Sequence, residues 1–115
     1  MIKKSQQKLV TLGDLEKFIL LAIINNKNHS YGVEIKRDIK EKINKDISVG
    51  ALYTTLDRLE TKGLILSTLG EATEERGGRA KKYFRVTALG QNTLNDSLRE
   101  IAQMANHLNP IAICS

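Results

Sequence analysis

A run of basic side chains in the second half of the sequence is the first candidate for chemistry. Residues 76–85 contain five positively charged side chains and no acid. Lysine and arginine neutralise phosphate groups, and backbone NH groups of glycines add hydrogen bonds to the same anions. The residues of this run that we expect to contact a polyanion are Arg76, Gly78, Arg79, Lys81 and Lys82.

A second candidate is one side of the segment at residues 48–62, which we expect to form a helix. Ser48 is a good N-cap, and Gly63 suits the position just after a helix C-terminus. With about 100° between successive residues, the apolar side chains cluster within about 80° of arc, which predicts a buried side. These apolar residues are Val49, Leu52, Leu56 and Leu59.

The opposite side of this expected helix carries small and hydroxyl side chains and one arginine, where a solvated face would normally carry Glu and Lys. Short side chains allow close approach to another surface, and Arg58 can reach a guanine edge or a phosphate. Tyr53 and Thr55 are expected at the two margins of this side. The binding candidates in the segment are Ser48, Gly50, Ala51, Tyr53, Thr54, Thr55 and Arg58.

Two helices are expected before this segment. The first begins with Asp14 as N-cap and has apolar residues around most of its circumference, which is typical of a buried central helix. The second begins with Ser30 as N-cap and has an apolar stripe along one side. The stripe consists of Tyr31, Ile35, Ile39 and Ile43. The candidates for contact with a polyanion on this second helix are Tyr31, Lys36 and Arg37.

After Gly63 the pattern changes from helical to extended. Residues 64–69 form a short apolar run. Residues 81–87 alternate, with Tyr83 and Arg85 on one side and Phe84 and Val86 on the other. Two strands of an antiparallel hairpin are therefore expected, and the basic run lies in its long loop and second strand.

The last expected helix begins at the N-cap Thr87 and runs to about Asn109, where Pro110 disfavours continuation. An apolar seam with alternating spacings of four and three residues follows one side of it. The seam consists of Leu94, Leu98, Ile101, Ala105 and Leu108. It either packs onto the chain's own domain or forms an interface with a second copy.

The order of these elements predicts the fold. Helix, helix, turn, helix and then a basic β-hairpin is the order of a winged helix-turn-helix domain, so the fold class is mainly α with a small β-hairpin (α+β). We expect a mobile basic arm at residues 1–11, a DNA-binding domain at residues 12–87, and a C-terminal helix and short tail at residues 88–115. In such a domain the third helix enters the major groove of double-stranded DNA, and the hairpin contacts the flanking backbone.

Three separated motifs occur in this order: YGVEI at 31–35; GALYTTLDRLE at 50–60 followed by KGLI at 62–65; and RAKKYFRVT at 79–87 ending in LG at 89–90. Together they resemble the PadR family of bacterial transcriptional regulators. The resemblance implies a homodimeric winged-helix repressor whose dimer interface is the helix after the hairpin. Such a dimer is expected to bind a pseudo-palindromic operator, and a small-molecule effector between the dimerisation helices is compatible with it.

The sequence departs from the family pattern in two ways. Thr54 stands where the family often has proline. Some relatives hold flat aromatic ligands with a tryptophan on the dimerisation helix, whereas this sequence contains no tryptophan. That mode of ligand binding is therefore not expected. The region after the hairpin is also short, so a single dimerisation helix is expected.

Composition and reactive residues exclude several classes of protein. The net charge of +5 favours polyanionic partners. Cys114 is the only cysteine, and His29 and His107 lack ligands at suitable spacing, so no disulfide, metal or cofactor is expected. No P-loop or nucleophile motif is present, so an enzyme is not expected. The longest apolar run is seven residues, against about 20 for a membrane span, so no membrane association is expected and the cytoplasm fits best.

Two other interpretations stay open on the sequence alone. The basic run could be a solvated loop, since charge runs usually are. The domain could also be a winged-helix protein-interaction module without sequence-specific DNA binding. Such modules tend to lose the basic hairpin and to carry acidic or large apolar residues on the third helix, and on both points this sequence favours DNA.

Overall fold

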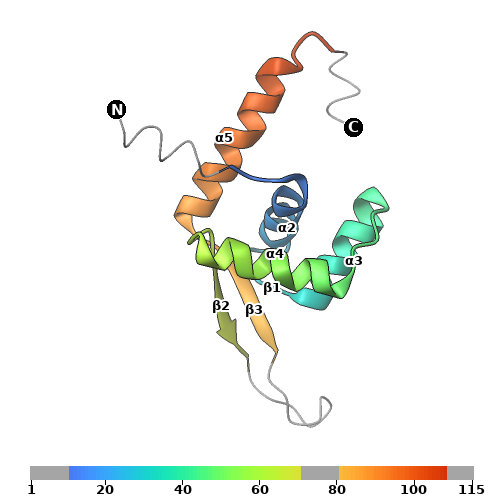
Figure 1. Cartoon of the computed structure of the whole chain (residues 1–115), viewed down its shortest axis with the longest axis vertical. Coiled ribbons are helices and arrows are strands. Elements are labelled where there is room, and N and C mark those ends of the chain that lie inside the picture. The colour runs from blue at the N-terminus through green and yellow to red at the C-terminus, as the bar shows by residue number, and fades with distance from the viewer. Residues whose placement is uncertain (1–10, 71–80, 109–115) are drawn as a thin grey trace.

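The computed structural model describes residues 11–70 and 81–108 of the chain. Within them, helices pack on one side of a small three-stranded antiparallel sheet (Figure 1). In chain order the elements are α2 (Asp14–Asn25), β1 (Ser30–Tyr31), α3 (Gly32–Ile43), α4 (Val49–Thr61), β2 (Ile65–Leu69), β3 (Lys82–Val86) and α5 (Ala88–Met104). This arrangement confirms the expected α+β winged-helix fold. The hairpin β2–β3 and the end of α5 extend in opposite directions from the core (Figure 1).

Helix α2 contributes the largest share of the helical core. Its buried apolar residues are Ile19, Leu20, Ala22 and Ile23. The N-cap is Gly13, and the expected cap Asp14 is instead the first helical residue. The cause of this difference is Glu16, whose Oε1 accepts a hydrogen bond from the backbone NH of Gly13 at 2.8 Å and fixes the helix start one residue earlier.

A two-residue strand, β1, precedes α3 where the sequence indicated only a helix start. Ser30 pairs with Phe84 of β3, and Tyr31 pairs with Tyr83. The expectation that Ser30 caps α3 is wrong, because Tyr31 is the N-cap and its NH donates to Glu34 Oε1 at 3.2 Å. The buried Ser30 hydroxyl donates to the same oxygen. A strand this short shows no alternation that a sequence could reveal.

The sheet has the order β1-β3-β2, with both pairings antiparallel. Phe84 and Val86 of β3 are buried against the helices, and Arg85 between them is exposed. Leu66 of β2 lies opposite Arg85 and is also exposed. The expected hairpin and its alternation are therefore confirmed, and residues 71–80, which connect β2 to β3 in the sequence, lie outside the described part of the chain.

Helix α5 begins at the expected N-cap. Thr87 Oγ1 accepts a hydrogen bond from the NH of Gly90 at 3.0 Å and donates one to the Gly63 carbonyl at 2.8 Å. The helix ends at Met104, earlier than the expected Asn109. The residues directly after Met104 form turns, because they include asparagine and histidine, which are weak helix formers, and they lie away from the core (Figure 1).

The close contact between α5 and the hairpin leaves no room for a side chain at Gly90. A Cβ there would overlap the carbonyl oxygen of Leu64 and lie 2.7 Å from Val86 Cγ1. We predict that Gly90→Ala lowers the free energy of unfolding by about 1–3 kcal/mol, the usual cost of overpacking. Urea unfolding followed by circular dichroism measures this loss.

Gly50 of α4 is the matched control, because a Cβ added there would meet nothing within 4 Å. Alanine is the better helix former, so Gly50→Ala is expected to change the free energy of unfolding by no more than a gain of about 1 kcal/mol. Equal losses in the two variants would contradict the role of the close contact at Gly90.

The loop between α3 and α4 is tied back to α3 by an ion pair. Lys36 Nζ lies 3.1 Å from Asp46 Oδ1. The hydrogen bond from Lys36, its positive charge and that of Lys40 together lower the pKa of Asp46 from its ordinary value of 3.8. Lys36, which was expected from the sequence to contact a polyanion, is therefore paired with the loop that leads into α4.

We predict that Lys36→Met raises the pKa of Asp46 toward its ordinary value, because the strongest cause of its lowering is removed. The folded pKa lies below the unfolded one, so the pair stabilises the fold above the unfolded pKa, and this contribution is lost as the pH falls through the folded pKa. Asp46 is exposed, so salt weakens the effect. An NMR titration of the side-chain carboxyl carbon measures the pKa, and an identical Asp46 titration in the variant would refute the assignment.

Candidate nucleic-acid interface

The start of α4 is open to solvent. Ser48 is the N-cap, and its Oγ accepts a hydrogen bond from the NH of Ala51 at 3.0 Å. Ser48, Val49, Gly50 and Ala51 are all exposed, and a Cβ added at Gly50 would meet nothing within 4 Å. Another surface can therefore approach the helix backbone closely at this end.

The rest of α4 has the two sides that its sequence predicts. The buried residues on the inner side include Leu52, Leu56 and Leu59. Thr54 and Arg58 on the opposite side are exposed. Val49 was expected among the buried leucines but is 59% exposed, because it lies in the first turn, at the open end of the helix. Val49 therefore adds an apolar side chain to the exposed surface, which the sequence did not predict.

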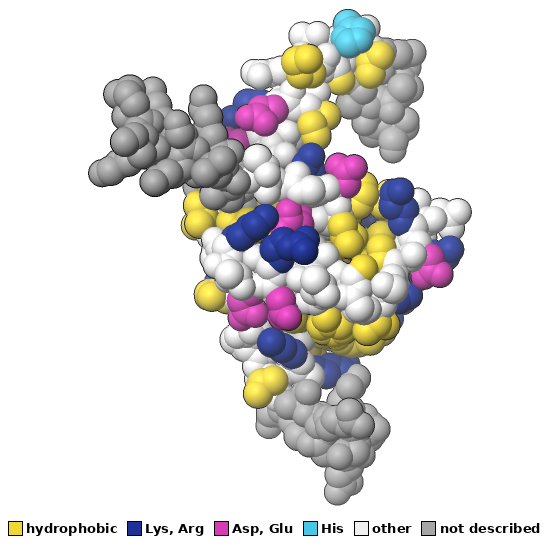
Figure 2. Space-filling view, viewed as in Figure 1, with side chains coloured by type: hydrophobic (Ala, Val, Ile, Leu, Met, Phe, Trp, Pro, Cys, Tyr) yellow, Lys and Arg dark blue, Asp and Glu magenta, His cyan; other side chains and the backbone are white. Residues whose placement is uncertain are grey.

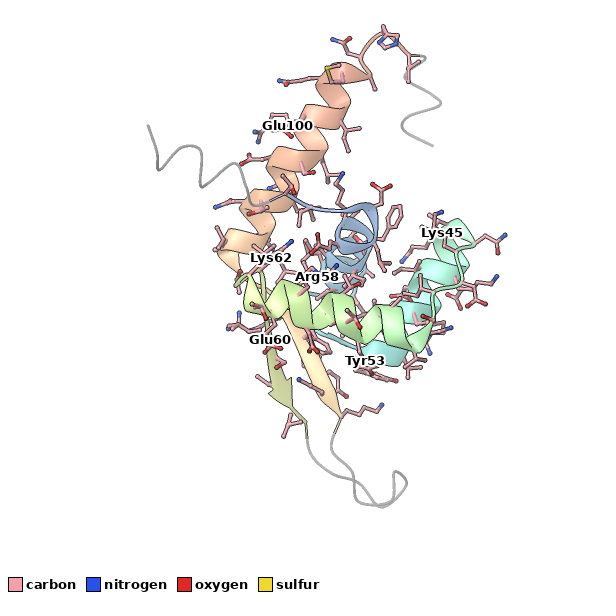
Figure 3. All side chains as sticks on the ribbon, viewed as in Figure 1. Lys45, Tyr53, Arg58, Glu60, Lys62 and Glu100 are labelled. Atoms are coloured by element: carbon pink, nitrogen blue, oxygen red, sulfur yellow. The ribbon has the colours of Figure 1, made fainter. Side chains whose placement is uncertain are left out.

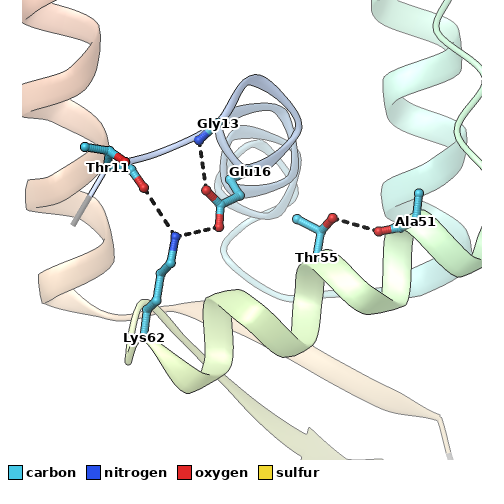
Figure 4. A network of polar contacts seen from close by, with 6 residues as sticks. All are labelled: Thr11, Gly13, Glu16, Ala51, Thr55 and Lys62. Carbon is cyan, nitrogen blue, oxygen red and sulfur yellow. Dashed lines mark hydrogen bonds and ion pairs between the residues drawn. The ribbon is translucent and has the colours of Figure 1, made fainter. Parts of the chain in front are cut away.

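Thr55 is not available to a binding partner. It is 5% exposed, and its hydroxyl donates to the Ala51 carbonyl at 2.7 Å (Figure 4). The expectation that Thr55 lies at the margin of the outward side is wrong. Its hydroxyl is satisfied within the helix, which allows a polar residue to be buried there.

The outward side of α4 has a basic edge and an acidic edge. Arg58 and Lys62 lie on one side of the ribbon, and Glu60 lies on the other (Figure 3). Glu60 accepts a hydrogen bond from the Ser67 hydroxyl of β2 at 2.7 Å, so this carboxylate already has a partner. Arg58, in contrast, is exposed.

Asp57 is a second carboxylate on α4, and it was not among the residues selected from the sequence. Its side chain is exposed. Because residues three apart are neighbours on a helix surface, Asp57 lies beside Thr54 on the outward side. The helical spacing that predicts an outward position for Thr54 and Arg58 also predicts one for Asp57, and this signal could have identified it.

Lys62 anchors the end of α4 to the start of α2. Its Nζ lies 2.9 Å from Glu16 Oε2 and donates to the Thr11 carbonyl at 3.2 Å (Figure 4). The other carboxylate oxygen of Glu16 accepts the NH of Gly13. One buried carboxylate thus joins two elements and fixes the direction of α4. No sequence signal pointed to this contact, because 46 positions separate Glu16 and Lys62.

Tyr53 connects α4 to the start of α3. Tyr53 is 42% exposed, and its hydroxyl lies so close to Gly32 that any Cβ there would overlap it. Figure 3 places Tyr53 toward the α3 end of α4. The side chain is therefore held in place by packing while part of it stays exposed to a partner.

Aromatic rings beside β3 hold Lys81, which lies at the end of the hairpin where Leu69 pairs with Lys82. The rings of Tyr31 and Tyr83 meet edge-on with centroids 5.5 Å apart, and Lys81 Nζ lies 3.8 Å from the Tyr31 ring centroid. His29 stacks on Tyr83 with a centroid separation of 4.4 Å. Lys82 is exposed. The structure therefore brings Tyr31 and Lys81 together in one cluster.

The remaining basic candidates are distributed around this surface. Arg37 of α3 is exposed, and Lys36 is paired with Asp46. Arg76, Gly78 and Arg79 lie outside the described residues. Figure 2 shows basic side chains over α4 and lower down on the hairpin, with acidic side chains between them.

The apolar seam expected on α5 divides into an inner and an outer part. Leu94 is 1% exposed and belongs to the core of its own domain, which corrects its expected place in a dimer interface. Leu98, Ile101 and Leu108 are 36%, 50% and 51% exposed, and Ala105 is half-buried. The division arises because only the first turns of α5 rest on the domain, whereas its end extends beyond it (Figure 1).

The described residues show no cluster that could hold a metal. Within residues 11–70 and 81–108, no three side chains of His, Cys, Asp or Glu come together in a way that suits a metal ion. No helix over the same residues has the length and apolar character required to cross a membrane.

Comparison with known proteins places this chain in a family. The model of the transcriptional regulator PadR-like family matches residues 20–96. A protein from Lysinibacillus sphaericus named "Uncharacterized protein X" is 32% identical over 94 residues, which are 80% of this chain and 82% of that protein.

Two solved structures resemble this one over most of their length. A transcriptional regulator from Clostridium thermocellum has a TM-score of 0.67 and 29% identity, covering 79% of this chain and 85% of the other. A PadR-like transcriptional regulator from Bacillus cereus has a TM-score of 0.66 and 26% identity, covering 85% of this chain and 90% of the other. The chain therefore belongs to the PadR-like family of transcriptional regulators, which bind DNA and are not enzymes.

Proposed function

We propose that this chain is a sequence-specific repressor that binds double-stranded DNA as a homodimer. The observation that carries the proposal is the outward side of α4, where Gly50, Ala51 and Thr54 expose the helix to close approach and Arg58 extends from one edge. The major groove, about 12 Å wide, accepts a helix whose contact side has short side chains. Arg58 is the residue in this proposal that reads a guanine edge.

The basic residues around α4 supply the affinity that does not depend on sequence. Exposed Lys82 and Arg37, together with Lys81 over the Tyr31 ring, neutralise phosphates on either side of the groove. Tyr53 and the capped start of α4 add hydrogen bonds to the backbone. The proposal also keeps the expected contacts from the hairpin tip by Arg76, Gly78 and Arg79.

The outer part of the α5 seam is the proposed contact with a second copy. Exposed leucine and isoleucine side chains along one side of a helix gain free energy when a second apolar surface covers them. In this proposal residues 12–87 form the DNA-binding domain, and residues 88–115 form the dimerisation segment. Two-fold symmetry then requires a pseudo-palindromic operator with half-sites about 10 bp or a multiple of this apart.

Release of DNA by a small molecule is the remaining part of the proposal. A ligand between the α5 helices of a dimer changes the separation of the two α4 helices only if it binds one separation better than the other. The chain has no tryptophan to stack on a flat ligand, so apolar contacts of α5 would hold it. As a regulator of bacterial genes, the protein would act in the cytoplasm.

Selection from a random pool of duplexes at about 150 mM salt tests the proposal, because nonspecific phosphate binding is already weakened at this salt concentration. Enrichment of a two-fold symmetric motif is the expected result. A folded protein that enriches no motif would refute sequence-specific binding and favour a winged-helix module for protein interaction.

We predict that Arg58→Ala weakens binding to the selected duplex by about 1–3 kcal/mol and has a smaller effect on random duplexes, because a base contact is lost. Lys82→Ala is the contrasting variant. It is expected to weaken both duplexes equally and to lower the slope of log affinity against log salt by about one. Fluorescence anisotropy over a series of salt concentrations measures both effects, and equal losses on the two duplexes for Arg58→Ala would remove Arg58 from base reading.

We also predict that Ile101→Lys yields monomers in analytical ultracentrifugation, because an ammonium group cannot be buried unpaired in an apolar interface. Gln103→Lys is the control, since this exposed residue lies on the opposite side of α5 and should remain dimeric. Circular dichroism should show an intact fold for both variants, and the apparent stability of Ile101→Lys should fall only by the contribution of the lost association. A dimeric Ile101→Lys protein would place the interface elsewhere.

A further inference from the structure

Asp57 carries a carboxylate on the outward side of α4. In the proposed function this side faces DNA, which is a polyanion. Its side chain is exposed, and it lies one turn from Thr54 and directly beside Arg58 in the sequence. DNA carries one negative charge per about 1.7 Å of helix axis, so a carboxylate at this interface is repelled unless it has a specific partner. Asp57 therefore weakens nonspecific binding to DNA, so its presence at this position requires an explanation.

Local structure does not provide that explanation. Within residues 11–70 and 81–108, Asp57 makes no hydrogen bond or ion pair. The residues three or four positions away are Tyr53, Thr54, Glu60 and Thr61, so no cation lies at the spacing that stabilises a helix. Aspartate is also a weak helix former, and in the middle of α4 it has no capping role.

Glu60 provides an instructive comparison on the same helix. Its carboxylate is half-buried and accepts the Ser67 hydroxyl at 2.7 Å, so its role is to join α4 to β2. Asp57, three residues earlier, is exposed on the outward side. Of these two carboxylates, only Asp57 is free to accept a hydrogen bond from a partner molecule.

Two amino groups donate hydrogen bonds in the major groove, N4 of cytosine and N6 of adenine, and the adenine amine lies beside the N7 acceptor, which repels a carboxylate. An ionised carboxylate only accepts hydrogen bonds, and the N4 amine of cytosine is the donor with which Asp and Glu pair in this groove. Guanine presents only acceptors there and repels a carboxylate. Arg58, which has only donors, has the opposite preference, so the two adjacent residues complement the two members of a G·C pair or of neighbouring pairs.

We propose that Asp57 is a specificity-determining residue that accepts a hydrogen bond from the amino group of a cytosine in each half-site. This inference rests on the proposed DNA-binding function of α4. Asp57 admits cytosine and rejects bases that place an acceptor at the same position. It also lowers affinity for DNA in general, so that the ratio of specific to nonspecific binding increases.

The test compares wild type, Asp57→Asn and Glu60→Gln in the same random-duplex selection at about 150 mM salt. Both variants remove one negative charge from the same edge of α4, and each preserves the shape of its side chain. Wild type should favour cytosine by about tenfold at one symmetric position. Asp57→Asn should lose this preference or exchange it for adenine, the partner of asparagine. Glu60→Gln should select the wild-type motif.

Different outcomes overturn different parts of the argument. If Asp57→Asn selects the same motif as wild type, and both variants bind all duplexes more tightly to the same extent, Asp57 acts only through its charge and the inference is wrong. If folded wild type selects no motif, the proposed function itself fails, and the inference fails with it. Circular dichroism and urea unfolding of each variant show whether its fold is intact.

Discussion

The packing of α4 on the core determines which side of this helix reaches solvent, and every proposed contact with DNA depends on that orientation. Leu52, Leu56 and Leu59 are almost completely buried. Burying a leucine side chain contributes about 1.5–3 kcal/mol relative to leaving it exposed. Rotating α4 by one residue position, about 100°, would expose leucines and bury its polar side. The core therefore keeps Thr54 and Arg58 in solvent without any contact of their own.

Contacts at the two ends of α4 restrict the movement of the helix that its core packing leaves open. Lys62 is held by the Glu16 carboxylate and the Thr11 carbonyl at one end, and Tyr53 packs against Gly32 toward the other. The outward side between these points has no described partner within the chain for Arg58 or Asp57. The helix backbone is therefore positioned before binding, which lowers the entropy cost of presenting these polar side chains to base edges.

Several features that depend on a single element are predictable from the sequence. Ser48 and Thr87 were identified as N-caps from residue type and position, and the alternation of Phe84 and Val86 predicted the inner side of β3. Errors at helix ends, such as Asp14 and Val49, arose within one element, whereas other errors came from contacts between elements. Thr55 and Leu94 are both buried in the domain. The sequence of one helix does not show which other element covers a given side of it, so neither burial was predicted. The strand at Ser30 depends on pairing with Phe84, which is 54 positions later in the chain, and no local pattern encodes that pairing.

The division of α5 into two parts connects dimerisation with DNA reading in the proposed dimer. Leu94 belongs to the same buried cluster as Leu52, Leu56 and Leu59, and Gly90 lies directly against the Leu64 carbonyl. The first turns of α5 therefore move with α4 as one body. Because Leu98 and Ile101 are exposed on the same helix, a change in how two copies meet at these residues becomes a change in the separation of their α4 helices. Close packing makes this transmission stiff, so a small rearrangement at α5 is sufficient to misalign the two half-site contacts.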